Sequence, residues 1–199
     1  MLPEMRAAAD KLIFDCANTE YVATTIGPRA LDRPIERLGW SVRQLIGHLA
    51  LSLETCADKL PKLSTAAPSE LESFDRDEAN AEMAAKTAKT PLPDLLETMA
   101  RGRDRCIAAF ADLDEQALAR KVAGETTLGD VIRSWLPHFE EHALDFLDAE
   151  PKLRRDILVL NWVLYADYGD RPDLIERQRE LMAEVRQWAG EGGDLEESE

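Results

Sequence analysis

Three histidines are the side chains in this sequence best suited to carry chemistry, and the chain has no others. His138 and His142 are four residues apart, so on a helix both imidazoles project from one face with Cβ atoms about 6 Å apart. His48 borders the apolar side of another predicted helix, between Leu45 and Leu49. Face-to-face packing of these two helices would bring the three rings together.

Three neutral imidazoles are suitable ligands for a divalent ion. They would hold zinc or nickel, with iron or manganese as alternatives, and would leave coordination positions open for water or a substrate. The competing interpretation is that each histidine is a packing residue whose ring nitrogens are bonded to neighbours, and the His-x3-His spacing alone favours it. The third histidine on a second apolar stripe favours the metal site.

Two carboxylates accompany the histidine pair. Glu141 lies three residues after His138, and Asp145 lies three residues after His142. On a helix this spacing places each carboxylate beside a possible ligand, where it could accept a hydrogen bond from the imidazole or transfer a proton. The alternative is that both are ordinary solvated charges on a helix surface.

The hydrophobic pattern that must position these residues is helical throughout, and it contains no alternating run long enough to build a sheet. The sequence therefore predicts an all-α fold. The predicted helices cover residues 3–24, 42–60, 92–113, 128–146, 153–168 and 172–189, with a long loop over 29–39 and a long connection over 62–90 that carries a short exposed helix near 75–88.

Helix boundaries are predicted from capping residues and prolines. Three helix starts carry side chains typical of an N-cap, namely Ser41 with Gln44, Thr90, and Thr127 with Asp130. Pro61 is expected to end the second helix. Pro137 lies inside the 128–146 helix, where it removes a backbone donor, so we expect a kink close to His138.

Composition limits the class of protein. The chain has 199 residues, with 39 acidic and 24 basic side chains and a formal net charge of −15. An acidic protein is not suited to nucleic acid, and no apolar stretch is long enough to cross a membrane. Three cysteines without a Cys-x-x-Cys pair and an N-terminus without a signal-peptide core predict a cytoplasmic protein with reduced, packed thiols.

The predicted helices and the local composition also suggest how the chain is divided into domains. Residues 1–150 form the predicted bundle that carries the histidines. Residues 151–189 form a helical extension that packs on the bundle or makes a dimer contact, because the 153–168 helix is apolar on most sides. Residues 190–199 hold five acidic and no basic side chains, which is typical of a disordered tail.

Two segments carry a resemblance to a known family. Residues 39–50 read GWSVRQLIGHLA, and residues 127–131 and 138–142 read TLGDV and HFEEH. These resemble the motifs of the DinB superfamily, which includes the N-terminal domains of mycothiol-dependent maleylpyruvate isomerases. Over residues 12–147 the resemblance implies a four-helix bundle with long connections, often dimeric, in which His48, His138 and His142 are the metal ligands.

The sequence also departs from that family's isomerase branch. The isomerases tend to have a carboxylate as the middle ligand, where this chain has His138. Residues 151–189 do not resemble the C-terminal domain of the isomerases. Both differences weaken transfer of the isomerase activity itself, while the metal triad still follows from the resemblance.

Two functions remain open at this stage. The first is a metal-dependent enzyme that activates a low-molecular-weight thiol or water for transfer, isomerisation or hydrolysis of a small molecule. The second is a non-catalytic helical protein that dimerises or binds a partner through its apolar C-terminal helix. Nucleotide-dependent and serine-hydrolase functions are disfavoured, because the chain has no phosphate-binding glycine loop and no nucleophile elbow.

Overall fold

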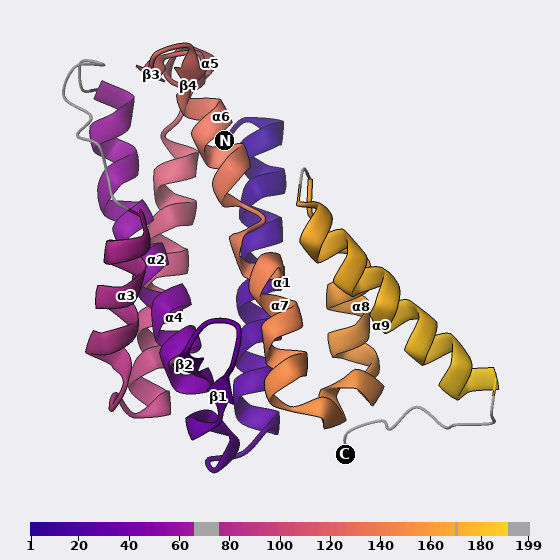
Figure 1. Ribbon diagram of the computed structural model, residues 1–199. Coiled ribbons are helices and arrows are strands. Elements are labelled where there is room, and N and C mark those ends of the chain that lie inside the picture. Colours follow the sequence, from indigo (N-terminus) through magenta and orange to yellow (C-terminus); the bar gives the residue numbers. More distant parts are fainter. Residues whose placement is uncertain (66–75, 170, 191–199) are drawn as a thin grey trace. The chain divides into compact units, whose positions relative to one another are not determined.

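The computed structural model describes residues 1–65, 76–169 and 171–190 (Figure 1), and most of these residues are helical, as the periodicity predicts. The α-helices are α1 (Pro3–Thr25), α2 (Val42–Thr65), α3 (Arg76–Thr87), α4 (Leu92–Ala111), α5 (Glu115–Leu118), α6 (Leu128–Trp135), α7 (His138–Ala149), α8 (Ile157–Leu164) and α9 (Pro172–Gly190). Two 3-10 helices, η1 (Ala30–Asp32) and η3 (Pro151–Arg155), complete the helical elements. The all-α prediction is confirmed.

Two short hairpins were not predicted. β1 (Pro34–Ile35) pairs with β2 (Trp40–Ser41) inside the expected 29–39 loop, and β3 (Lys121–Ala123) pairs with β4 (Thr126–Thr127). Glycines at positive φ, Gly39 and Gly124, lie in the two turns. Strands of two or three residues are too short for an alternating pattern, so only the turn residues mark them in the sequence.

The chain forms two compact units. Unit 1 contains Met1–Cys16 and Arg43–Leu136, and unit 2 contains Ala17–Val42 and Pro137–Glu199. Helix α1 and the α6–α7 segment each contribute residues to both units. The predicted boundary between a bundle of residues 1–150 and an extension of residues 151–189 stays a prediction, and the predicted tail lies outside the described residues after Gly190.

In unit 1, helices α2 and α4 approach closely at Gly102. A Cβ atom at Gly102 would lie 2.7 Å from Cβ of Leu53, so only glycine permits this approach. Two ion pairs connect the same helices, Arg101 to Glu54 at 2.7 Å and Arg105 to Asp58 at 2.5 Å. The residue number rises by four on both helices from the first ion pair to the second, so α2 and α4 run parallel. Parallel helices need a long connection, as predicted between these two.

Two predicted helix boundaries are wrong. Pro61 does not end the second helix, because α2 continues through it to Thr65. Buried Ala57 and Leu60 precede the proline, and their packing outweighs the one backbone hydrogen bond that its ring removes. Thr90 does not cap α4 either. Pro91 occupies the N-cap, and its carbonyl accepts from the amides of Asp94 and Leu95.

The predicted capping box at Thr127 is confirmed. The Thr127 hydroxyl accepts from the Asp130 amide at 3.1 Å, and the Asp130 carboxylate accepts from the Thr127 amide at 2.9 Å. The kink expected at Pro137 is a complete break, because α6 ends at Trp135 and α7 begins at His138. Pro137 is the N-cap of α7, a position where its missing amide donor leaves no helical hydrogen bond unmade.

In unit 2, helices α7, α8 and α9 contact one another and the 3-10 helix η3. The predicted 153–168 helix is wrong at both ends, because η3 occupies its start and α8 covers only Ile157–Leu164. Asp156 explains the late start of α8, since its carboxylate caps the amides of Leu158 and Val159 at 2.9 and 3.2 Å. The last predicted helix is confirmed as α9.

The apolar α8 is largely a core element. Val159, Leu160, Trp162 and Val163 are buried, whereas Leu158 is half exposed. Gln178 of α9 donates to the carbonyl of Val163 at 2.7 Å and so fastens α9 to the end of α8. The hydrophobic character of this segment is therefore explained mainly by packing inside unit 2.

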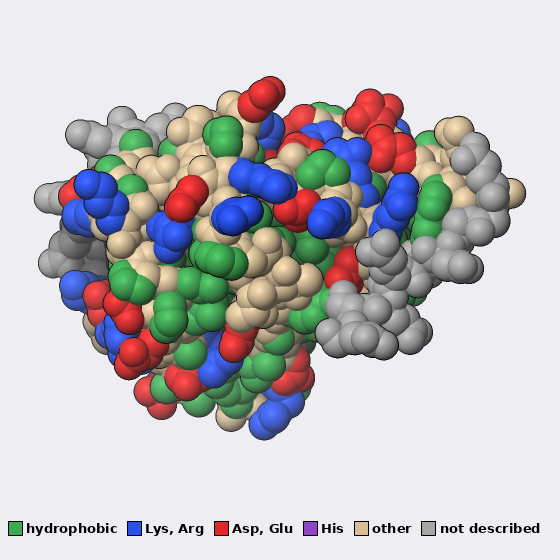
Figure 2. Space-filling model, turned by 90° about the horizontal axis from the view of Figure 1, so that it is seen from below, with side chains coloured by type: hydrophobic (Ala, Val, Ile, Leu, Met, Phe, Trp, Pro, Cys, Tyr) green, Lys and Arg blue, Asp and Glu red, His purple; other side chains and the backbone are tan. Residues whose placement is uncertain are grey.

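Charged side chains of both signs lie on the surface (Figure 2), as the composition leads one to expect. On the face drawn in Figure 2, basic and acidic side chains are mixed rather than gathered by sign. Within the described ranges, every helix is too short or too polar to cross a bilayer. The three cysteines are free thiols, Cys16 and Cys106 buried and Cys56 half buried, which confirms their prediction as packed residues.

Candidate metal centre

His138 and His142 come together at the start of α7 in unit 2. His138 is the first residue of the helix, directly after the capping Pro137, and His142 lies one turn later. The two ring centroids are 5.0 Å apart and the ring planes make an angle of 83°. Both imidazoles thus project to one side of the helix, as the spacing of four residues predicts.

Asp145 orients the second histidine of the pair. Its carboxylate Oδ2 lies 2.9 Å from Nδ1 of His142, and its side chain is 0% exposed. A carboxylate only accepts hydrogen bonds, so chemistry assigns the proton to Nδ1 of a neutral His142 ring. The lone pair is then on Nε2, which is the arrangement found in metal-binding histidines whose other nitrogen donates to a carboxylate.

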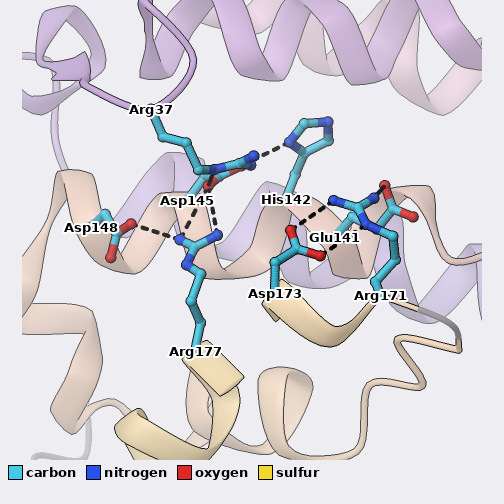
Figure 3. A network of polar contacts seen from close by, with 8 residues as sticks. All are labelled: Arg37, Glu141, His142, Asp145, Asp148, Arg171, Asp173 and Arg177. Atoms are coloured by element: carbon cyan, nitrogen blue, oxygen red, sulfur yellow. Dashed lines mark hydrogen bonds and ion pairs between the residues drawn. The ribbon is translucent and has the colours of Figure 1, made fainter. Parts of the chain in front are cut away.

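Two arginines hold the same carboxylate (Figure 3). Arg37, from the turn between β1 and β2, donates from Nε to Oδ1 at 3.0 Å and from Nη2 to Oδ2 at 2.6 Å. Arg177, from α9, donates to Oδ1 from Nη1 at 3.3 Å and from Nη2 at 3.2 Å. Arg177 also binds Asp148, one turn further along α7, at 2.6 Å.

The surroundings keep Asp145 ionised. Burial raises the pKa of its carboxyl, but hydrogen bonds from His142 and Arg37, together with the charge of Arg37, outweigh burial and hold the pKa below its ordinary value. A carboxylate held by two guanidinium groups is a weak base. Its contacts therefore favour orientation of His142 over proton transfer.

Glu141 has different contacts from Asp145. Its carboxylate pairs with Arg171 at 3.1 Å, and Arg171 also pairs with Asp173 at the start of α9 at 3.0 Å (Figure 3). The side chain is 29% exposed. Sequence spacing treats Glu141 and Asp145 alike, yet of these two carboxylates Asp145 is the one that shares a hydrogen bond with a histidine.

Sequence reasoning missed two residues near the histidine pair, Arg37 and Arg177. Arg37 and Arg177 bind Asp145, and Tyr168 is a buried side chain whose hydroxyl lies near the charges of Glu140 and Asp145. Burial raises the pKa of Tyr168. Arg37 lies two residues before Gly39 of the first family motif, which was an available signal, whereas no pattern in the sequence marks Arg177.

His48 belongs to unit 1. It lies in the second turn of α2, is 1% exposed, and follows a glycine at a close helix contact. A Cβ atom at Gly47 would lie 2.1 Å from Oγ1 of Thr87, so α3 packs directly against the backbone beside His48. Joint ligation of one ion by His48 and the α7 pair stays a prediction.

The cysteines of unit 1 are not candidates for a reactive centre. Burial raises the pKa of the Cys16 thiol to about 12. A hydrogen bond with Cys106, together with burial, raises the pKa of Cys56. Thiols with raised pKa values contain little thiolate and are poor nucleophiles at neutral pH, so thiol chemistry in this protein would need a thiol supplied from outside.

The donor set fits a divalent ion on chemical grounds. Neutral imidazoles are common ligands for zinc and nickel, and His142 has the carboxylate partner that such ligands require. The His138 and His142 pair of unit 2 is thus compatible with metal binding.

Comparison with known proteins agrees with the motifs. No curated protein and no solved structure matches the chain. The family model of the DinB superfamily matches residues 15–146, which is most of the chain and includes all three histidines. This match, together with the helical fold, shows that the chain belongs to the DinB superfamily.

Proposed function

We propose that this protein binds one divalent metal ion through His48, His138 and His142, and that it uses the ion to activate a small thiol or water. The observation that carries the proposal is the hydrogen bond between Asp145 and His142, because a buried, ionised carboxylate that fixes the tautomer of one imidazole is typical of metal ligands. Membership of the DinB superfamily supports the same ligand set.

Each residue of the proposed site would have its own role in binding the ion. Nε2 of His142 would be presented to the ion, while Asp145 would hold Nδ1 protonated and limit rotation of the ring. His138 and His48 would supply two more neutral nitrogens. A bound divalent ion lowers the pKa of a coordinated thiol or water and so supplies a nucleophile at neutral pH.

A thiol S-transferase or isomerase-like reaction is the enzymatic function we favour. Cys16 and Cys56 have raised pKa values and Cys106 is fully buried, so the nucleophilic sulfur would come from a low-molecular-weight thiol. Such a thiol and a small-molecule substrate would be the partners, in the cytoplasm that the sequence predicts, and the protein would act as a monomer or homodimer. Zinc and nickel suit the ligand set, with iron and manganese as alternatives.

The first experiment measures metal content. Untagged protein, purified without nickel, is analysed by elemental mass spectrometry next to His48→Ala, His138→Ala and His142→Ala. Ser134→Ala is the control, because Ser134 is exposed on α6 close in sequence to the histidines. We expect about one ion per chain in the wild type and the control, and a loss in each histidine variant that circular dichroism shows to be folded.

A folded wild type that holds no ion and takes up none from added zinc, nickel, iron or manganese would overturn the proposal. Metal content that stays unchanged in the folded His48→Ala variant would remove His48 from the ligand set. If metal is bound, wild type and His142→Ala are compared in the metal-dependent consumption of low-molecular-weight thiols offered with electrophilic small molecules.

The alternative is a non-catalytic protein that binds a partner or a second copy of itself. One observation favours it, the exposure of Leu158 on α8 and of Tyr165 directly after it, at 50% and 83%. The rest of α8 is buried within unit 2, which leaves a small apolar surface. A monomer at all concentrations in analytical ultracentrifugation, combined with stoichiometric metal, would exclude self-association as the function.

A further inference from the structure

The C-terminal helix α9 reaches the residues around His142 although it lies outside the family match. The match ends at residue 146, and α9 begins at Pro172. Arg177, in the second turn of α9, nevertheless donates to Asp145 from both terminal nitrogens and to Asp148 at 2.6 Å. Its side chain is 22% exposed, so this contact is largely shielded from solvent.

The geometry of the contact restricts Asp145. Arg177 connects two carboxylates that are three residues apart on α7, and its planar guanidinium has a fixed arrangement of donors. Arg37 binds both carboxylate oxygens of Asp145. Arg177 binds only Oδ1, which is the oxygen that does not face His142. The second carboxylate oxygen remains directed at Nδ1 of His142 at 2.9 Å.

The helix itself is fixed in place by further contacts. Gln178, next to Arg177 in the sequence, donates to the carbonyl of Val163, and Glu184, two turns later, pairs with Arg154 of η3 at 2.8 Å. Arg171, just before α9, pairs with Glu141. A guanidinium on a helix held at several points is pre-organised, so it orients its partner more effectively than a freely moving surface arginine would.

We infer that Arg177 is a positioning residue for the proposed metal centre. Acting through Asp145, it fixes the tautomer and orientation of the His142 ring, so that a helix absent from the matched family segment sets the metal affinity of this protein. This inference rests on the proposed function in one respect, that His142 is a ligand. Carboxylates that orient ligating histidines contribute about 10- to 100-fold to metal affinity, and a residue one contact further away should contribute less.

The experiment compares Arg177→Gln and Arg177→Lys with wild type and with the control Arg179→Gln. Arg179 lies on the same helix, is 72% exposed and pairs only weakly with Glu176. Two quantities are measured, the zinc dissociation constant by competition with a chromophoric chelator and the tautomer of the His142 ring in metal-free protein by its ¹⁵N chemical shifts. The melting temperature of each metal-free protein is recorded as well.

We expect zinc binding about three- to tenfold weaker in Arg177→Gln, below the loss for a directly bonded carboxylate. We also expect the ¹⁵N shifts of His142 to move from a single tautomer toward a mixture. Arg177→Lys should recover part of both effects, because it restores the charge without the planar fork. Arg179→Gln should behave as wild type.

Unchanged zinc affinity and an unchanged His142 tautomer in Arg177→Gln would overturn the inference, even if its melting temperature fell, because Arg177 would then be structural only. If wild-type protein binds no zinc, the proposed function fails. The tautomer measurement in metal-free protein still decides whether Arg177 orients His142.

Discussion

His142 and His48 lie in surroundings of different chemical character. His142 is oriented by charge, through a buried carboxylate that binds Arg37 and Arg177. His48 is buried on a tightly packed stretch of α2, where Leu45, Ile46, Leu49 and Ala50 are fully buried and Gly47 lies against Thr87. The two histidines thus lie in different surroundings, one beside charged groups and the other on a tightly packed helix.

The difference predicts different sensitivities. A carboxylate and guanidinium network is directional and responds to loss of a charge or to pH. An apolar helix contact has no charge to lose, and it responds to a change of volume. Substitutions that remove a charge should therefore affect the His142 region, and substitutions that add a methyl group should affect the His48 region.

Replacing Asp145 by Asn should give the largest effect. The amide keeps the shape but leaves Arg37 without its counter-charge and Arg177 with Asp148 alone. Loss of the buried partner of such an ion pair is expected to lower the free energy of unfolding by about 3 kcal/mol. Metal affinity should fall about 10- to 100-fold. Urea denaturation of metal-free protein and a zinc competition titration measure the two effects.

Low pH should abolish the difference in unfolding free energy between wild type and Asp145→Asn. The pKa of Asp145 is lowered by folding, so the carboxylate stabilises the native state above the unfolded pKa of about 3.9, and this stabilisation is lost as pH falls through the lower folded pKa. The difference in unfolding free energy between wild type and Asp145→Asn should be constant near neutral pH and shrink below about pH 4. A difference that persists unchanged in acid would assign the effect to packing instead of charge.

Replacing Gly47 by Ala tests the packed side of the comparison. The added Cβ would lie 2.1 Å from Oγ1 and 2.2 Å from Cβ of Thr87, so α2 and α3 must move apart. Overpacking of this kind lowers the free energy of unfolding by about 1–3 kcal/mol, and the loss should not depend on pH. Gly190→Ala is the control, because a Cβ atom there meets open space.

The sequence predicts the helices well because each buries a periodic apolar stripe, and it identifies His138 and His142 as neighbours because helical spacing alone places them so. The boundaries fail where tertiary contacts override local signals. Pro61 is tolerated inside α2, and Asp156 starts α8 later than its apolar run suggests. The hairpin that carries Arg37 is too short for any periodic signal.

The partners of Asp145 are the least predictable part of the centre. Arg37 and Arg177 are 108 and 32 residues away from Asp145 in the sequence, and an arginine on a helix surface looks the same whether it faces solvent or a buried carboxylate. Only the fold decides which of the chain's arginines meets the Asp145 carboxylate. Spacing on one helix is local information, whereas charge pairing between elements is not.

Another prediction concerns the capping box at the start of α6. Thr127→Ala removes the hydroxyl that caps the Asp130 amide, and the free energy of unfolding should fall by about 1 kcal/mol. Hydrogen bonds from Thr127 and Arg133 lower the pKa of Asp130 to about 2, so in Thr127→Ala the carboxyl should titrate at a higher pH. Zinc affinity should stay at the wild-type value, because neither histidine region is altered. An NMR titration measures the pKa of Asp130, and the zinc competition assay measures the affinity. A clear loss of zinc affinity would mean that the α6 cap helps to position the histidines.

The smallest effect is expected for Glu141→Gln, which separates the two carboxylates that sequence spacing makes equivalent. Glu141 is 29% exposed and its partner Arg171 is 42% exposed, so solvent screens their ion pair, and such pairs contribute about 0–1 kcal/mol. Arg171 also keeps its contact with Asp173 in the variant. Zinc affinity and unfolding free energy should therefore both remain close to wild type, measured beside Asp145→Asn under the same conditions. A loss of zinc affinity comparable to that of Asp145→Asn would contradict this prediction. It would show that Glu141 leaves Arg171 and acts at the metal, as its spacing from His138 allows.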